Sequence, residues 1–353
     1  PILIGDSINH RVTQVQFKGP RGMATDQERE NIKKIATIGF RTYLENGDRD
    51  AFSELANELL AQSSEVWTPL VSSFWALLHM EDLATAAGLA EMYRPKMWWM
   101  PTPYPGNFGD ILTPYILWHA FGVMPRWVPI GQADGLCVGS IIKNAREGTR
   151  VWGAGAPRRS DPLCPAAVYT AVRGPLTREV VVAWGGQCAE IYGDPAVLLP
   201  ELYKPEVTKT YKIGIIPHVS QEAKIRSALS QINAGHIKVI SLRAASFTDI
   251  ERVIRDIMSC NETVTTSLHG LIVSHAYAVP SQLLRLAADP APLVDPFKIQ
   301  DYRCSVGLTD KSLVVSLPFK DTSWLARRSC TLPPSPINRA ALRAAFPFPV
   351  RVG

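Results

Sequence analysis

The stretch that decides the fold is TTSLHGLIVSHAYAVP, which runs from Thr265 to Pro280. The β-branched residues at its start indicate the end of a buried strand, Ser267–Gly270 form a tight polar turn, and Leu271–Ala278 have helical spacing. A strand that turns into a helix exposes backbone N–H groups at the positive end of the helix dipole. His269 in that turn can therefore meet an anionic ligand. In the plainer alternative, Ser267 caps the helix and His269 only fills the turn.

Working outward, the pattern predicts two α/β lobes with parallel sheets, because strand-like and helix-like segments alternate on both sides of a proline-containing linker near residues 200–210. We expect residues 1–95 to form an arm and a small helical appendage, residues 96–205 a first lobe, and residues 206–353 a second lobe whose tail crosses back. Strands are expected at residues 96–100, 135–140, 149–152, 167–172, 211–216, 237–242, 262–266 and 282–286. Helices are expected at residues 111–121, 221–232, 247–258, 271–278, 321–328 and 338–345.

The charge of the chain is uneven. Residues 1–95 carry 9 Lys and Arg against 13 Asp and Glu, a net charge of −4, whereas residues 96–353 carry 28 against 19, a net charge of +9. A mildly basic body suits an acidic substrate or an anionic membrane face, and it is too weak a signal for nucleic acid. We therefore predict peripheral contact with the inner membrane face and no nucleic-acid partner.

The chain is expected to be cytoplasmic. It has no run of 18 apolar residues and no visible signal peptide. The six cysteines are scattered without metal-ligand spacing, so we expect free thiols and no metal site.

Three further polar groups follow predicted strands, where ligands bind in open α/β sheets. Asn107-Phe108-Gly109-Asp110 is a loop that enters a helix, Arg173 precedes a proline-started helix, and Asp194 lies in a loop. Arg173 suits a carboxylate or phosphate contact, and its alternative is a surface salt bridge. Asp110 either activates a hydroxyl or caps its helix, and a structural or ligand role is open for Asp194.

Five pieces together resemble the polysaccharide pyruvyl transferase family over about residues 96–307. They are Asn107–Asp110, Arg173–Thr177, Gly193–Ala196, Ser267–Gly270 with its helix, and Phe297–Tyr302. The resemblance implies a GT-B-like enzyme that moves the pyruvyl group of phosphoenolpyruvate onto a sugar of a surface polysaccharide or its lipid-linked precursor, forming a ketal without a cofactor.

The resemblance also implies that Arg173 and His269 belong to the donor site, and the chemistry of the other residues suggests their roles. His269 and Asp110 are the predicted catalytic pair. The predicted donor-binding residues are Arg173, Ser267, Leu268, Gly270 and Lys298, and the predicted acceptor-binding residues are Asn107, Gly109 and Asp194. Members of the family often carry an arginine at the position of Ser267. The corresponding clamp for a carboxylate or phosphate is therefore either missing here or supplied by Arg158, Arg159, Arg285 or Lys298.

Two other functions stay open. A glycosyltransferase of the same architecture would use a nucleotide sugar, although no convincing base-reading site is visible. An inactive sugar-binding relative would not need Arg173, His269 and Asp110 together.

Overall fold

The computed structural model describes residues 80–100, 106–232, 235–244, 246–287, 296–309 and 312–351. These residues lie in one compact unit, His79–Gly353. The predicted N-terminal arm and most of the predicted helical appendage are therefore outside the described residues. Only the end of the appendage is described, and it is helical over residues 80–86.

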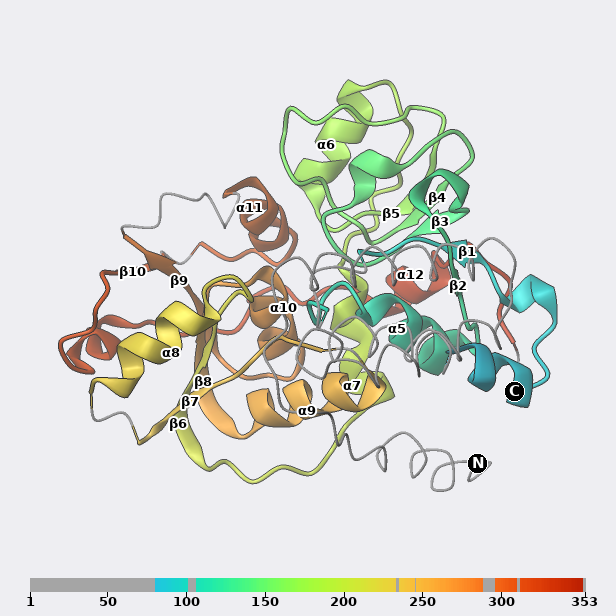
Figure 1. Ribbon diagram of the computed structural model, residues 1–353. Coiled ribbons are helices and arrows are strands. Elements are labelled where there is room, and N and C mark those ends of the chain that lie inside the picture. Colours follow the sequence, from blue (N-terminus) through green and yellow to red (C-terminus); the bar gives the residue numbers. More distant parts are fainter. Residues whose placement is uncertain are drawn as a thin grey trace, which may run out of the picture. The chain divides into compact units, whose positions relative to one another are not determined.

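The first sheet has five parallel strands in the order β2-β1-β3-β4-β5 (Figure 1). Their bounds are β1 Lys96–Met97, β2 Arg126–Trp127, β3 Gly135–Leu136, β4 Arg150–Trp152 and β5 Val168–Ala171. The chain leaves β1 toward one edge and then places β3 on the other side of β1. The order in which successive strands are added therefore reverses between β1 and β3.

The second sheet also has five parallel strands, in the order β10-β9-β8-β6-β7. Their bounds are β6 Tyr211–Ile216, β7 Ile237–Val239, β8 Cys260–Thr265, β9 Ser281–Leu286 and β10 Leu313–Val315. In this sheet the order in which successive strands are added reverses between β6 and β8. Such a switch point opens a crevice at the carboxyl ends of the strands, where ligands bind in α/β folds.

Helices connect these strands, as the alternating pattern predicts. The α-helices are α5 Leu112–Phe121, α6 Pro175–Ala183, α7 Leu199–Leu202, α8 Glu222–Ser230, α9 Phe247–Met258, α10 Leu268–Ala276, α11 Pro296–Ser305 and α12 Arg339–Ala344. Short 3-10 helices are η1 Glu91–Tyr93, η2 Ile130–Gln132, η3 Ile142–Asn144, η4 Pro195–Leu198 and η5 Ser323–Arg327.

The helix between β9 and β10, and the chain that follows the second sheet, pack against residues of the first lobe. Phe297 of α11 joins the apolar core around β3, β4 and β5. Trp152 of β4 donates a hydrogen bond to the carbonyl oxygen of Leu342 in α12 (2.8 Å), and Phe346 stacks on Phe121 of α5. These contacts bury aromatic surface that the short strands of the first sheet leave uncovered.

The observed α/β fold with two parallel sheets agrees with the predicted Rossmann-like lobes. The strand β6 and the helix α9 have the predicted bounds. The strands β2 and β10 were not predicted, because two or three residues show no clear period. Residues 323–327 form a 3-10 helix where an α-helix was expected. The GT-B arrangement itself stays a prediction.

Candidate functional site

The turn between β8 and α10 is held by the side chain of Thr265. Its hydroxyl oxygen lies 2.9 Å from the carbonyl oxygen of Ile216 in β6 and accepts a hydrogen bond from the N–H of Ser267 (3.0 Å). A methyl group on Gly270 would overlap that hydroxyl oxygen, so the first turn of α10 can lie close to the sheet only with glycine there. Ser267 is the N-cap residue but makes no side-chain capping bond.

His269 lies in the first turn of α10 and is 7% exposed. Its Nε2 atom is 3.4 Å from Oδ2 of Asp194. On the other side, the backbone of Gly109 is so close that a Cβ atom would overlap Nδ1 of the ring. The imidazole is therefore placed between a loop of the first lobe and the carboxylate of Asp194 at the start of η4.

Asp194 is fully buried and begins the 3-10 helix η4. Its Oδ1 accepts a hydrogen bond from the N–H of Ala196 (3.0 Å), which fixes the carboxylate. Gly153 allows η4 to approach β4, since a Cβ atom there would collide with Pro195, and its φ of +83° also favours glycine. The second oxygen of Asp194 is left to face His269.

The loop Asn107–Asp110 pairs with the segment that follows β7. Phe108 donates its N–H to the carbonyl oxygen of Leu242 (2.8 Å), and Ala244 donates to the carbonyl oxygen of Gly106 (2.8 Å). These main-chain bonds fix the loop against the second lobe. Asn107 then donates from Nδ2 to Oδ2 of Asp110 (3.3 Å).

Burial raises the pKa of Asp110 to about 6, and the nearby charges of His269 and Lys298 limit the rise. An ideal Cβ atom on Gly139, just after β3, would lie 3.6 Å from the Asp110 carboxylate. Asp110 therefore sits at the switch point of the first sheet, and His269 sits at that of the second.

Three buried polar atoms at this place have no hydrogen-bond partner among the described residues. They are Oδ1 of Asn107, Oδ2 of Asp194 and Nε2 of His269. A buried polar atom without a partner costs free energy, and such atoms cluster where function requires them. These atoms mark the candidate site.

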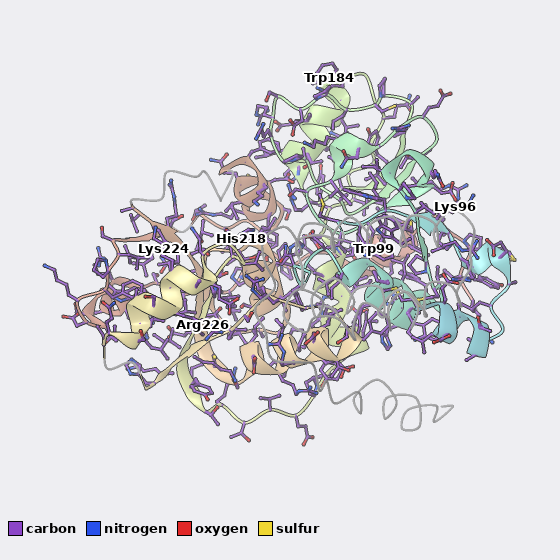
Figure 2. The ribbon with its side chains drawn as sticks, viewed as in Figure 1. Lys96, Trp99, Trp184, His218, Lys224 and Arg226 are labelled. Carbon is purple, nitrogen blue, oxygen red and sulfur yellow. The ribbon has the colours of Figure 1, made fainter. Side chains whose placement is uncertain are left out.

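His218 belongs to this region and was not predicted. It follows β6 and is labelled in Figure 2. Its N–H donates to Oγ1 of Thr266 (2.7 Å). Burial lowers the pKa of His218 to about 4, with smaller effects from the charges of Lys298 and His269. The sequence could have indicated His218, because it lies two residues after a predicted strand. The other predicted site residues were also found in segments that follow strands.

Arg173 has a structural environment. It is 0% exposed, and each of its three guanidinium nitrogens donates to the protein: Nε to Asp301 (3.1 Å), Nη1 to Ser140 (2.8 Å) and Nη2 to the carbonyl oxygen of Ala156 (2.8 Å). Asp301 of α11 also accepts from the N–H and the hydroxyl of Thr177. The ion pair is fully buried, which differs from the surface salt bridge that was the alternative, and donor binding by Arg173 stays a prediction.

The other predicted cations differ in position. Lys298 is half-buried and acts electrostatically on Asp110 and His218. Arg158 and Arg285 are exposed, and the exposed Arg159 pairs with Glu179 and lies over the ring of Phe297. Ser267, Leu268 and Gly270 are buried in the turn beside His269.

No group of three or more potential metal ligands occurs within the described ranges. In the same part of the chain, no helix combines the length and the apolar character that a membrane span needs. The six cysteines are free.

The fold and the site define an α/β protein with a buried His–Asp pair where the switch points of two parallel sheets come together. The model of the polysaccharide pyruvyl transferase family matches residues 151–283, so the predicted resemblance is confirmed for that part. The match contains Arg173, Asp194 and His269.

An uncharacterized protein of Acanthamoeba polyphaga mimivirus is 27% identical over 177 residues, which are 48% of this chain and 59% of that protein. The chain thus spans less than two thirds of that relative's length. No solved structure matches the chain.

Proposed function

We propose that the protein transfers the pyruvyl group of phosphoenolpyruvate to a sugar of a surface polysaccharide or its lipid-linked precursor, and that it forms a ketal. The observation that carries this proposal is the meeting of His269, Asp194 and Asp110 within and beside the region that matches the family. An imidazole, the fully buried carboxylate of Asp194 and the half-buried carboxylate of Asp110 can serve a proton-transfer reaction between an enol and a hydroxyl.

Phosphoenolpyruvate is small and multiply anionic, so its site must supply cations and N–H groups. The first turn of α10 offers the free N–H groups of a helix N-terminus. Lys298 supplies a positive charge close enough to act on Asp110 and His218. We therefore place the donor between the start of α10 and Lys298.

In the proposed reaction His269 donates a proton to the methylene carbon of the enol, which leaves an oxocarbenium-like centre at the neighbouring carbon. A sugar hydroxyl adds to that centre and gives its proton to Asp110. A second hydroxyl then displaces the phosphate, which closes the ketal, and the proton of that hydroxyl leaves with the phosphate. The proton held by Asp110 returns to His269 through solvent, which restores both residues. The oxidation states of donor and acceptor together do not change, so the chemistry calls for no redox cofactor, and we propose that none is used.

Asp110 gives this reaction a pH dependence. Its pKa of about 6 means that the carboxylate is mostly ionised and able to accept a proton at neutral pH. We expect turnover to rise as the pH increases through about 6, and we expect this rise to be lost in Asp110→Asn. Rate profiles of both proteins between pH 5 and about pH 8 provide the measurement.

The same substitution also has a predictable effect on stability. Because burial raises the pKa of Asp110 in the folded protein, its contribution to stability is present below the unfolded pKa and is lost as the pH rises through about 6. Asp110→Asn should therefore stabilise the protein at pH 8, by up to about 3 kcal/mol, and should not do so at pH 4. If the variant melts at or below the wild-type temperature at pH 8, the conclusion that ionised Asp110 destabilises the folded protein is wrong.

The donor itself can be tested by thermal shift. Phosphoenolpyruvate at 100 times its dissociation constant should add about 2.7 kcal/mol to the free energy of unfolding. A panel of nucleotide sugars is the matched comparison. Stabilisation by a nucleotide sugar and not by phosphoenolpyruvate would replace this proposal with a glycosyltransferase, and stabilisation by oligosaccharides alone would indicate a sugar-binding protein.

We also propose a cytoplasmic location with peripheral contact at the inner membrane face. The net charge of +9 on residues 96–353 supports this contact, because lipid-linked acceptors lie at an anionic surface.

A further inference from the structure

Asp194 holds two groups at once. Oδ1 accepts from the N–H of Ala196 at the start of η4, and Oδ2 lies 3.4 Å from Nε2 of His269. The carboxylate is fully buried, and its orientation is set by the first contact. The contact between Oδ2 of Asp194 and Nε2 of His269 is therefore buried, and the hydrogen bond to Ala196 fixes its geometry.

Neither Oδ2 of Asp194 nor Nε2 of His269 has another partner in the described part of the chain. A carboxylate oxygen can only accept a hydrogen bond, whereas an imidazole nitrogen donates when it carries the proton and accepts when it does not. A bare Nε2 would set two buried lone pairs against each other. The proton of the neutral ring is therefore favoured on Nε2.

The other ring nitrogen, Nδ1, lies on the side of the backbone of Gly109. Only glycine allows this approach, because any Cβ atom there would overlap the ring. The same loop carries Asp110, whose charge interacts with that of His269. Nδ1 thus borders the loop in which the acceptor side was predicted.

We propose that Asp194 is a positioning residue that keeps the proton of His269 on Nε2, and that Nδ1 is the nitrogen that delivers the proton to the substrate. The role of Nδ1 rests on the proposed pyruvyl transfer, whereas the tautomer does not. When His269 takes up its second proton, Asp194 stabilises the imidazolium, and Nδ1–H is then ready to donate. This assignment replaces the predicted contact of Asp194 with the acceptor.

The tautomer can be observed without any substrate. Nitrogen NMR of the protein labelled with ¹⁵N-histidine distinguishes a protonated from a bare ring nitrogen, and His269→Gln identifies the signals of His269 among the seven histidines. The spectra are recorded at a pH where titration shows that the ring is neutral. The expected result is a proton on Nε2, and a proton on Nδ1 in the wild-type protein would overturn the proposal.

Asp194→Asn is the matched variant. The amide oxygen can still accept from Ala196, while the amide NH₂ now faces Nε2 and favours the opposite tautomer. We expect the proton to move to Nδ1 and turnover to fall at least about 100-fold. An unchanged tautomer in the folded Asn variant would also overturn the proposal.

Asp194→Ser separates the cap from the carboxylate, because serine is a good N-cap residue but is too short to reach His269. We expect this variant to melt near the wild-type temperature and to lose turnover as the Asn variant does. Full turnover in a folded Ser variant would show that Asp194 only caps η4. If the Asn variant does not fold, the wild-type tautomer and the Ser variant still decide the question. If the tautomers behave as expected but no pyruvyl transfer is found, only the proposed function fails.

Discussion

Replacement of His269 by glutamine is expected to lower turnover by about 10²–10⁴-fold, the usual contribution of a positioned acid or base, while the fold and most of the donor affinity remain. Glutamine can still fill the space beside Gly109 and form a hydrogen bond, but it cannot carry a proton to carbon. Product formation, donor affinity and melting temperature are measured on each variant. The rate profile should also change, because one of the titrating groups is removed.

His275 supplies the matched control, since it lies on the same helix. It is buried, and its Nδ1 is 2.9 Å from the hydroxyl oxygen of Tyr302. Burial lowers its pKa to about 4, so it is neutral at pH 7 and serves packing. His275→Gln should therefore cost stability and leave the chemical step unchanged. Near-wild-type turnover in a well-folded His269→Gln protein would rule out the proton-donor role.

Removal of the Arg173 side chain should have the largest effect on stability. We expect Arg173→Ala to lower the free energy of unfolding by about 3–5 kcal/mol, because it leaves the Asp301 carboxylate buried without its cation. It also removes a link between the end of β5 and α11, the helix that carries Lys298. Denaturant unfolding of the wild type and the variant gives the measurement.

Arg173→Met combined with Asp301→Asn tests whether the loss comes from the pair. The double variant should be more stable than the sum of the two single losses predicts, since neither partner is left as an unpaired buried charge. Donor titration of any folded variant then tests the predicted contact of Arg173 with phosphoenolpyruvate. If Arg173→Ala has the wild-type stability but loses affinity for phosphoenolpyruvate, donor binding is favoured over the structural role.

The sequence predicted the elements well where its pattern was strong. The apolar spacing of residues 247–258 and the serine before it define α9, whose N-cap Ser246 accepts from the N–H of Asp249. The β-branched end of β8 and the apolar run after Gly270 predicted the turn that holds His269. These features are local, because hydrogen bonding and side-chain spacing within ten to fifteen residues decide them.

The partners in the site were beyond such reasoning. Arg173 and Asp301 are 128 residues apart in the chain, and nothing in either neighbourhood indicates the other. His218 was missed because a single histidine after a strand is an ordinary loop residue until β6 and β8 are known to be neighbours.

By itself, the sequence determined two runs of parallel α/β elements and the positions of polar residues at the carboxyl ends of their strands. Only the tertiary structure decided which of those residues meet: Asp194 with His269, Gly109 against the same imidazole, and Arg173 with Asp301 in place of open solvent. The physical reason is that strand order and the packing of α10 on η4 bring together atoms that local sequence does not relate. Burial at those contacts then sets the charge state of Asp110 and the proton position we propose for His269.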